Sequence, residues 1–152
     1  MSHGARMSDP FDLERFVAAQ AEVYARVVVE LSDGRKRSHW MWFIFPQIEG
    51  LGSSAMAQRF AIRSRAEALA YLAHGVLGPR LIECTRHVLA VKNRTIYDIL
   101  GSPDDLKFRS SMTLFGAVSD NPIFGQAISV YYRGANDQAT LEILQRLDSA
   151  GA

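Results

Sequence analysis

Three consecutive cations are the clearest candidate for ligand chemistry in this sequence. The segment Arg35-Lys36-Arg37 leads through Ser38 and His39 into an aromatic run. Free backbone amides at a helix start, together with positive side chains, favour a bound phosphate or carboxylate. The alternative is a solvated loop in which Ser38 caps the following helix. We take Lys36 and His39 as the candidate ligand-binding residues of this segment.

Three hydroxyl side chains occupy an unusual place, the interior of a helix predicted from residue 103 onward. Ser110, Ser111 and Thr113 compete there with the backbone for hydrogen bonds, so they are poor fillers of a helix interior. They indicate either close helix packing with hydrogen bonds to backbone carbonyls, or hydroxyls directed at a ligand. Lys107 lies one turn before Ser111, and a cation beside small hydroxyls can hold an anionic group.

Two amides and two indoles complete the set of candidate residues. Gln20 falls on the apolar face of the first predicted helix, so its amide faces inward and needs hydrogen-bond partners. Those partners are either groups of the protein or a ligand, and Gln47 poses the same question in a loop. Trp40 and Trp42 offer rings for stacking on a base, while core packing is the alternative.

Other chemistries lack support in the sequence. The four histidines show no metal-ligand spacing, so we expect neither a metal nor a cofactor. The glycines form no phosphate-binding loop, and no serine lies in a nucleophile elbow. Cys84 is the single cysteine, which excludes an intramolecular disulfide, and we expect it to be a small buried hydrophobic residue.

Composition describes an ordinary single domain. The chain has 152 residues, of which 48% are hydrophobic, and its 17 basic and 16 acidic residues leave a net charge of +1. This balance argues against a nucleic-acid partner. No apolar run approaches the length of about 18 residues that spans a membrane, and the N-terminus lacks an apolar signal segment, so we expect no membrane partner and a cytoplasmic location. The oligomeric state stays open.

Helix signals recur along the whole chain and predict an all-α protein. One helical pattern runs from Leu13 to Leu31, with Asp12 as its N-cap and residues 32–34 as its stop. The aromatic run 39–45 suits a strand or a helix, and we predict a helix because no partner strand is found. Further helix starts are predicted at Ser64, Gly78-Pro79, Thr95, Ser102-Pro103, Asn121-Pro122 and Asp137.

These elements predict a single compact domain of about seven to nine short helices. Residues 1–8 are expected to form a flexible tail and residues 9–149 to form the domain. The chain contains no repeat, linker or low-complexity tract that would divide it.

Three sequence blocks resemble the family of domain of unknown function 1810, a group of small, mostly bacterial proteins. The blocks are Asp9-Pro10-Phe11-Asp12-Leu13-Glu14-Arg15-Phe16 with Ala19-Gln20, the run from Lys36 to Gln47 around His39-Trp40-Met41-Trp42, and the run from Asp105 to Phe115. The resemblance extends to about Leu147 and implies an all-helical fold, without an established activity. Some members carry a calpastatin-like label, which does not suit this apolar and unrepeated chain.

We expect the polar and aromatic residues singled out above to converge on one pocket. They are Gln20, Lys36, His39, Trp40, Trp42, Gln47, Lys107, Ser110, Ser111 and Thr113. Aromatic walls with a few fixed polar groups predict a small-molecule binding domain for an anionic or nucleotide-like metabolite. One alternative is a hydrolase of an ADP-ribose-type or nucleoside bond, with His39, Glu14 or Asp105 as general acid–base. The other is a helical protein-interaction module.

Overall fold

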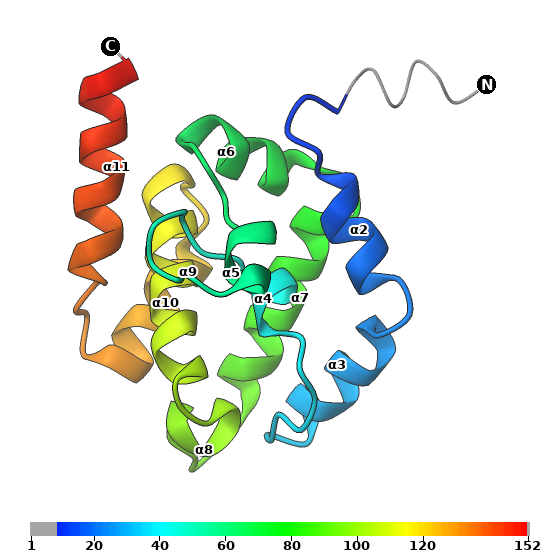
Figure 1. The fold of residues 1–152 in the computed structure, drawn as a ribbon. Coiled ribbons are helices and arrows are strands. Elements are labelled where there is room, and N and C mark those ends of the chain that lie inside the picture. The colour runs from blue at the N-terminus through cyan, green and yellow to red at the C-terminus, as the bar shows by residue number, and fades with distance from the viewer. Residues whose placement is uncertain (1–8, 152) are drawn as a thin grey trace.

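The computed structural model describes residues 9–151, so the predicted tail of residues 1–8 lies outside the described residues. Over this range the chain forms ten helices and no strand, which confirms the all-α prediction with a slightly higher count (Figure 1). None of these helices has the length and apolar character needed to cross a membrane. The helices are α2 (Glu14–Gln20), α3 (Tyr24–Ser32), α4 (Met41–Ile44), α5 (Ala55–Arg59), α6 (Arg65–Ala73), α7 (Leu77–Ala90), α8 (Ile96–Leu100), α9 (Asp104–Val118), α10 (Pro122–Tyr132) and α11 (Gln138–Gly151).

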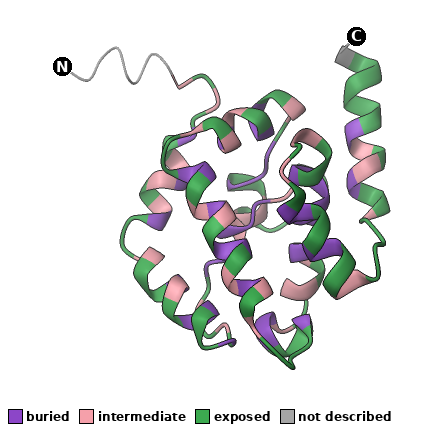
Figure 2. Cartoon of the chain, turned by 180° about the vertical axis from the view of Figure 1, so that it is seen from behind, coloured by how far each residue is buried: buried purple, intermediate pink, exposed green. Residues whose placement is uncertain are grey.

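Two long helices, α7 and α9, organise the packing. Helix α9 contacts α6, α8, α10 and α11, and α7 contacts α3, α4, α6 and α10. Aromatic rings fill the space around α9, where Phe108 meets Phe45 and Tyr131, and Phe115 meets Tyr71 and Phe124. Buried residues gather on the inward faces of the helices (Figure 2). Helix α11 lies at the edge of the molecule.

The first predicted helix is in fact two helices. Helix α2 ends at Gln20 and α3 begins at Tyr24, with a turn at residues 21–23. The apolar spacing concealed this break because Phe16 before it and Val27 after it are both fully buried in the same core. A continuous apolar pattern in the sequence therefore indicates that its residues share one core, but they can lie on two separate helices.

The N-cap predicted for the first helix is wrong. Asp12 adopts a left-handed φ of 53°, a conformation that aspartate tolerates better than most residues. The carboxylate of Asp9 takes the capping role, because it accepts hydrogen bonds from the backbone N–H of Leu13 (2.7 Å) and of Glu14 (3.0 Å). The turn at Pro10 brings the Asp9 carboxylate to the start of α2. Asp12 is nearer in sequence, but its side chain does not cap the helix.

Side-chain caps confirm the helix starts predicted at Ser64, Asn121 and Asp137, where each side chain accepts a backbone N–H of the first turn. At Ser64 only one half of a capping box forms. Ser64 Oγ accepts from the N–H of Glu67 (3.0 Å), but the Glu67 carboxylate accepts from the N–H of Arg63 (3.0 Å). Glu67 is thus available for a long-range partner.

The aromatic run forms the predicted short helix. Helix α4 is a single turn, and both residues that flank it, Trp40 and Phe45, are buried. Ile48 beyond it makes one isolated parallel bridge with Ile62. One turn suffices because the run lies at the centre of the core, where tertiary packing stabilises it rather than helix propensity.

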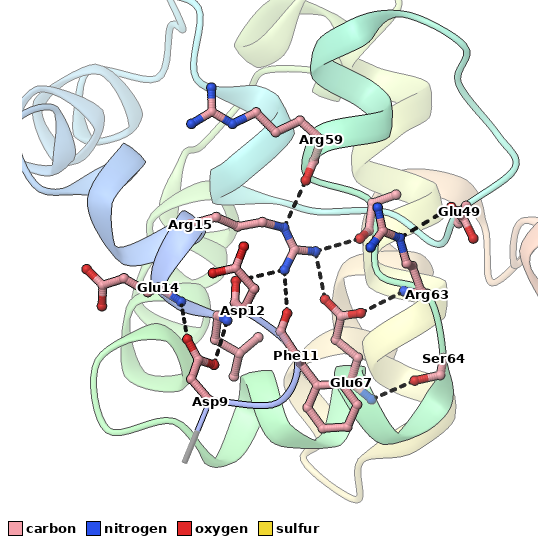
Figure 3. A network of polar contacts seen from close by, with 12 residues as sticks. Asp9, Phe11, Asp12, Glu14, Arg15, Glu49, Arg59, Arg63, Ser64 and Glu67 are labelled. Carbon is pink, nitrogen blue, oxygen red and sulfur yellow. Dashed lines mark hydrogen bonds and ion pairs between the residues drawn. The ribbon is translucent and has the colours of Figure 1, made fainter. Parts of the chain in front are cut away.

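Arg15 joins the N-terminal segment to the α5–α6 connection (Figure 3). Its guanidinium donates hydrogen bonds of 2.6–2.8 Å to the backbone carbonyls of Phe11, Asp12, Arg59 and Ala61 and to Glu67 Oε2. The side chains of Arg15 and Glu67 are only 11% and 3% exposed, so each neutralises a charge that would otherwise be buried without a partner.

Replacing Arg15 is expected to destabilise the fold strongly. The variant Arg15→Met leaves the Glu67 carboxylate buried without its cation and should lower the free energy of unfolding by about 3–5 kcal/mol. Arg63→Met is the matched control, because the Arg63–Glu49 pair is more than half exposed and should contribute less than about 1 kcal/mol. Urea unfolding measures both, and equal losses would contradict this role of Arg15.

Candidate functional site

Four of the predicted site residues gather around one carboxylate, Asp104, the first residue of α9. Asp104 Oδ2 lies 2.9 Å from Lys36 Nζ, and Oδ1 lies 3.8 Å from Lys107 Nζ. Each ammonium also lies over an indole ring, Lys36 over Trp40 at 5.0 Å and Lys107 over Trp42 at 5.1 Å. The lysines predicted to hold an anion therefore hold one supplied by the chain itself.

A second carboxylate of the chain fills the anion site predicted in the loop before α4. Glu30 accepts hydrogen bonds from the backbone N–H of Arg37 (2.8 Å) and Ser38 (3.0 Å), from Ser38 Oγ (2.6 Å) and from Trp40 Nε1 (2.9 Å). Ser38 thus binds Glu30 and does not cap α4, contrary to the sequence-based alternative. The amides that looked free are used within the fold.

The surroundings of Glu30 favour its ionised form. Burial by itself raises the pKa of this carboxyl, but the hydrogen bonds from Ser38, Arg37 and Trp40 outweigh it and lower the pKa to about 2. Trp40 is only 1% exposed, so its ring belongs to the core and offers no face for stacking on a base. Of the two roles that the sequence left open for Trp40, this burial favours core packing.

Gln20 finds all its partners within the protein. Its amide nitrogen donates to the Phe43 carbonyl (2.8 Å) and to the Tyr71 hydroxyl (3.3 Å), and its amide oxygen accepts from Arg80 (3.3 Å). The amide is 1% exposed and ties α2 to α4, α6 and α7. Of the two roles that the sequence left open for Gln20, the contacts favour the structural one.

Two of the three hydroxyls of α9 serve helix packing. Ser110 Oγ bonds to the Leu106 carbonyl (3.2 Å) and to Asp137 Oδ2 (3.0 Å). Thr113 Oγ1 donates to the Arg109 carbonyl (2.8 Å) and accepts from the N–H of Asp137 (2.9 Å). Both residues therefore dock the start of α11 onto α9, and they do not face the Asp104 cluster.

The remaining three candidates lie apart from these contacts. Ser111 is fully buried, and its hydroxyl has no hydrogen-bond partner among the described residues. Gln47 is half-buried and uses its backbone carbonyl to accept from the N–H of Ile62 (2.9 Å), while His39 is exposed. These contacts divide the predicted set: Lys36, Trp40, Trp42 and Lys107 come together around Asp104, whereas Gln20, Ser110 and Thr113 bond elsewhere.

A hollow of about 450 Å³ lies beside the Asp104 cluster, between the loop at residues 33–37 and α8. The N–H of Lys36 donates to the Ile99 carbonyl (2.7 Å) and so fixes the loop against the helix. Gly34 has a φ of 75°, and a Cβ there would lie 3.1 Å from Val91, so glycine permits this close approach. The polar and aromatic lining consists of Arg35, Lys36, Arg94, Tyr97 and Asp98.

The two arginines of this hollow make no ion pair with a carboxylate of the described chain. Arg35 and Arg94 are exposed, and within residues 9–151 neither guanidinium pairs with a carboxylate, whereas Arg37 pairs with Asp33 at 3.3 Å. Sequence reasoning missed Arg94 and Tyr97 because they lie some sixty residues from the cation run. The only signal was the basic stretch at 92–94, and it does not reveal which loop lies opposite.

Metal and thiol chemistry find no support in the described part of the chain. No group of three or more histidine, cysteine, aspartate or glutamate side chains there is arranged to hold a metal ion. Cys84 is fully buried, as predicted, and burial raises the pKa of its thiol to about 12. The reactive thiolate is therefore scarce at neutral pH.

The variant Glu30→Gln is expected to destabilise the protein in a pH-dependent way. The pKa of Glu30 is about 2 in the fold against an ordinary 4.5, so its contribution is complete above pH 4.5 and is lost as the pH falls toward 2. At pH 7 the loss should be about 1.5–3 kcal/mol. Urea unfolding at several pH values between 7 and 3 measures the gap from wild type, and a gap that stays constant would contradict this account.

The variant Asp104→Asn is expected to lower the free energy of unfolding by on the order of 3 kcal/mol, because it leaves the 8%-exposed side chain of Lys36 without its counter-ion. Adding Lys36→Met should recover part of the loss, since no unpaired charge remains. Asp33→Asn is the control, because its pair is half exposed. Additive effects of the two substitutions would show that the pair is not coupled.

Comparison with known proteins agrees with the helical fold and the resemblance of the sequence blocks. The model of the family described as "Protein of unknown function (DUF1810)" matches residues 10–144. The crystal structure of the conserved hypothetical protein Rv1873 from Mycobacterium tuberculosis is similar, with a TM-score of 0.89 and 56% sequence identity over 90% of this chain and 99% of that chain. The search of curated proteins gave no significant match. The chain belongs to the DUF1810 family of proteins of unknown function.

Proposed function

We propose that this protein binds a small anionic metabolite, with a phosphate or carboxylate group seated in the hollow between the 33–37 loop and α8. The observation that carries the proposal is the meeting of Arg35, Lys36 and Arg94 around one cavity of about 450 Å³. This volume lies within the range of roughly 300–1,000 Å³ that is usual for small-molecule sites. The chain as a whole has a net charge of only +1, so the hollow is a local concentration of positive charge.

The fold does not need these arginines to cap α8. The carbonyl of Tyr97 accepts from the N–H of Gly101 (2.8 Å), and the Ile99 carbonyl accepts from the N–H of Lys36 (2.7 Å). Two carbonyls of the last turn of α8 are therefore satisfied by backbone groups. The guanidinium groups of Arg35 and Arg94 stay available for a ligand, and their planar donor pairs suit phosphate and carboxylate oxygens.

Lys36 lines the hollow, and contacts within the protein hold its side chain in place. Its ammonium is held by Asp104 at 2.9 Å and lies over the ring of Trp40, so a ligand does not have to order it. Asp104 neutralises much of its charge, and the two arginines therefore carry most of the attraction for an anion.

Binding is favoured over hydrolysis by the residues of the hollow. Its described lining includes no histidine, and the carboxylate of Asp98 is engaged by the N–H of Thr95 (3.2 Å) in a capping box. A poised general acid–base is thus missing from this lining.

We include a cytoplasmic location in the proposal, since a single unpaired cysteine suits a reducing compartment.

A thermal-shift titration tests the proposal with inorganic phosphate, ribose 5-phosphate and citrate as probes. A bound probe at 100 times its Kd should add about 2.7 kcal/mol, which raises Tm by roughly 5–10 °C in a chain of this size. The double variant Arg35→Gln/Arg94→Gln should lose the rise, whereas Arg26→Gln, which changes an exposed arginine on α3, should keep it.

The difference in the ligand-induced rise of Tm between wild type and the variants decides whether the probe binds in this hollow. Phosphate and citrate also stabilise proteins by exclusion from the surface, and that general effect is the same in all three proteins. An equal rise in wild type and in the double variant, or no rise with any probe, would overturn binding in this hollow.

A further inference from the structure

We propose that the ligand of this hollow is a nucleotide, an aromatic base joined through a sugar to phosphate, with the base stacked on the ring of Tyr97. This inference rests on the proposed binding of an anion by Arg35 and Arg94. It adds a second recognition element on the same wall, since Tyr97 and the arginines line one cavity.

Tyr97 differs from every other tyrosine of the chain. The hydroxyls of Tyr24, Tyr71, Tyr131 and Tyr132 each make a hydrogen bond within the protein. Tyr97 makes no such bond among the described residues, and it is 61% exposed. Folding therefore accounts for the positions of the other four rings and leaves the position of this one unexplained.

The backbone that carries Tyr97 is held firmly. Helix α8 begins with a capping box in which Thr95 Oγ1 accepts from the N–H of Asp98 (3.0 Å), and the Asp98 carboxylate accepts from the N–H of Thr95 (3.2 Å). The neighbouring Ile96 and Ile99 are buried in the core. A ring that projects from a fixed backbone loses little freedom when a base stacks on it.

The ring of Tyr97 is available for the stacking that the sequence left open for the two indoles. Trp40 is buried, and Lys107 lies over the ring of Trp42. Tyr97 is the exposed ring in the lining of the basic hollow. Stacking on an aromatic side chain tolerates any base, because every base has a flat π-face. The geometry thus favours nucleotides as a class over one particular base.

Calorimetric titration with inorganic phosphate, ribose 5-phosphate, AMP and CMP tests the inference on the full chain. Wild type should bind AMP roughly 5- to 100-fold more tightly than ribose 5-phosphate, because base stacking adds that factor. The variant Tyr97→Leu should lose this preference while its affinity for ribose 5-phosphate stays unchanged. Tyr97→Phe, which keeps the ring, should retain the preference. Both replacements are on an exposed side chain, so the fold is preserved.

Each outcome has a distinct meaning. Binding of ribose 5-phosphate with no added affinity for AMP or CMP would overturn the nucleotide inference and leave the anion site intact. A preference for AMP that survives in Tyr97→Leu would likewise overturn the role of this ring. If wild type binds none of the four probes, the nucleotide inference fails together with phosphate binding in this hollow, and the proposed function as a whole fails if citrate does not bind either.

Discussion

The hydrogen bonding of Glu30 is the interaction on which the candidate site depends. One buried carboxylate receives four donors from residues 37–40, and burying a charge requires such satisfaction. These contacts set the course of the loop that follows α3. Through that course they place the Trp40 indole in the core and Lys36 at the wall of the hollow. The site is therefore built outward from an internal ion, and the buried pair of Lys36 with Asp104 ties the same loop to α9.

The same constraint recurs wherever a charge is buried in this fold. Glu67 meets Arg15 and Asp104 meets Lys36, and in both pairs the partners come from distant elements. Each pair is weak as a net source of stability, since desolvation opposes the attraction. Each is strong as a constraint on geometry, because any arrangement that separates the partners leaves a buried charge unsatisfied. The small helices of this protein are thus fixed relative to one another by polar contacts as well as by the aromatic core.

A polar residue on an apolar face has two readings, and the partners within the fold decide between them. Gln20, Ser110 and Thr113 make hydrogen bonds to groups of the protein, so they act in packing. Arg35, Arg94 and Tyr97 lack such partners among the described residues and share one hollow. Unused hydrogen-bonding and stacking capacity is what marks them as candidates. Side chains whose hydrogen-bonding or stacking capacity is not used within the fold are therefore the best candidates for a function.

The sequence by itself determined the helical class, the family and many helix starts, such as those at Ser64, Asn121 and Asp137. Helix caps can be predicted from the sequence because the capping side chain binds a backbone N–H only two or three residues away. The tertiary structure decided which cations remain free, because the partner of Lys36 lies at position 104 and the neighbour of Arg35 at position 94. These long-range neighbours are brought together only when the helices pack and their surfaces lose water. They therefore depend on the assembled core and not on the local sequence.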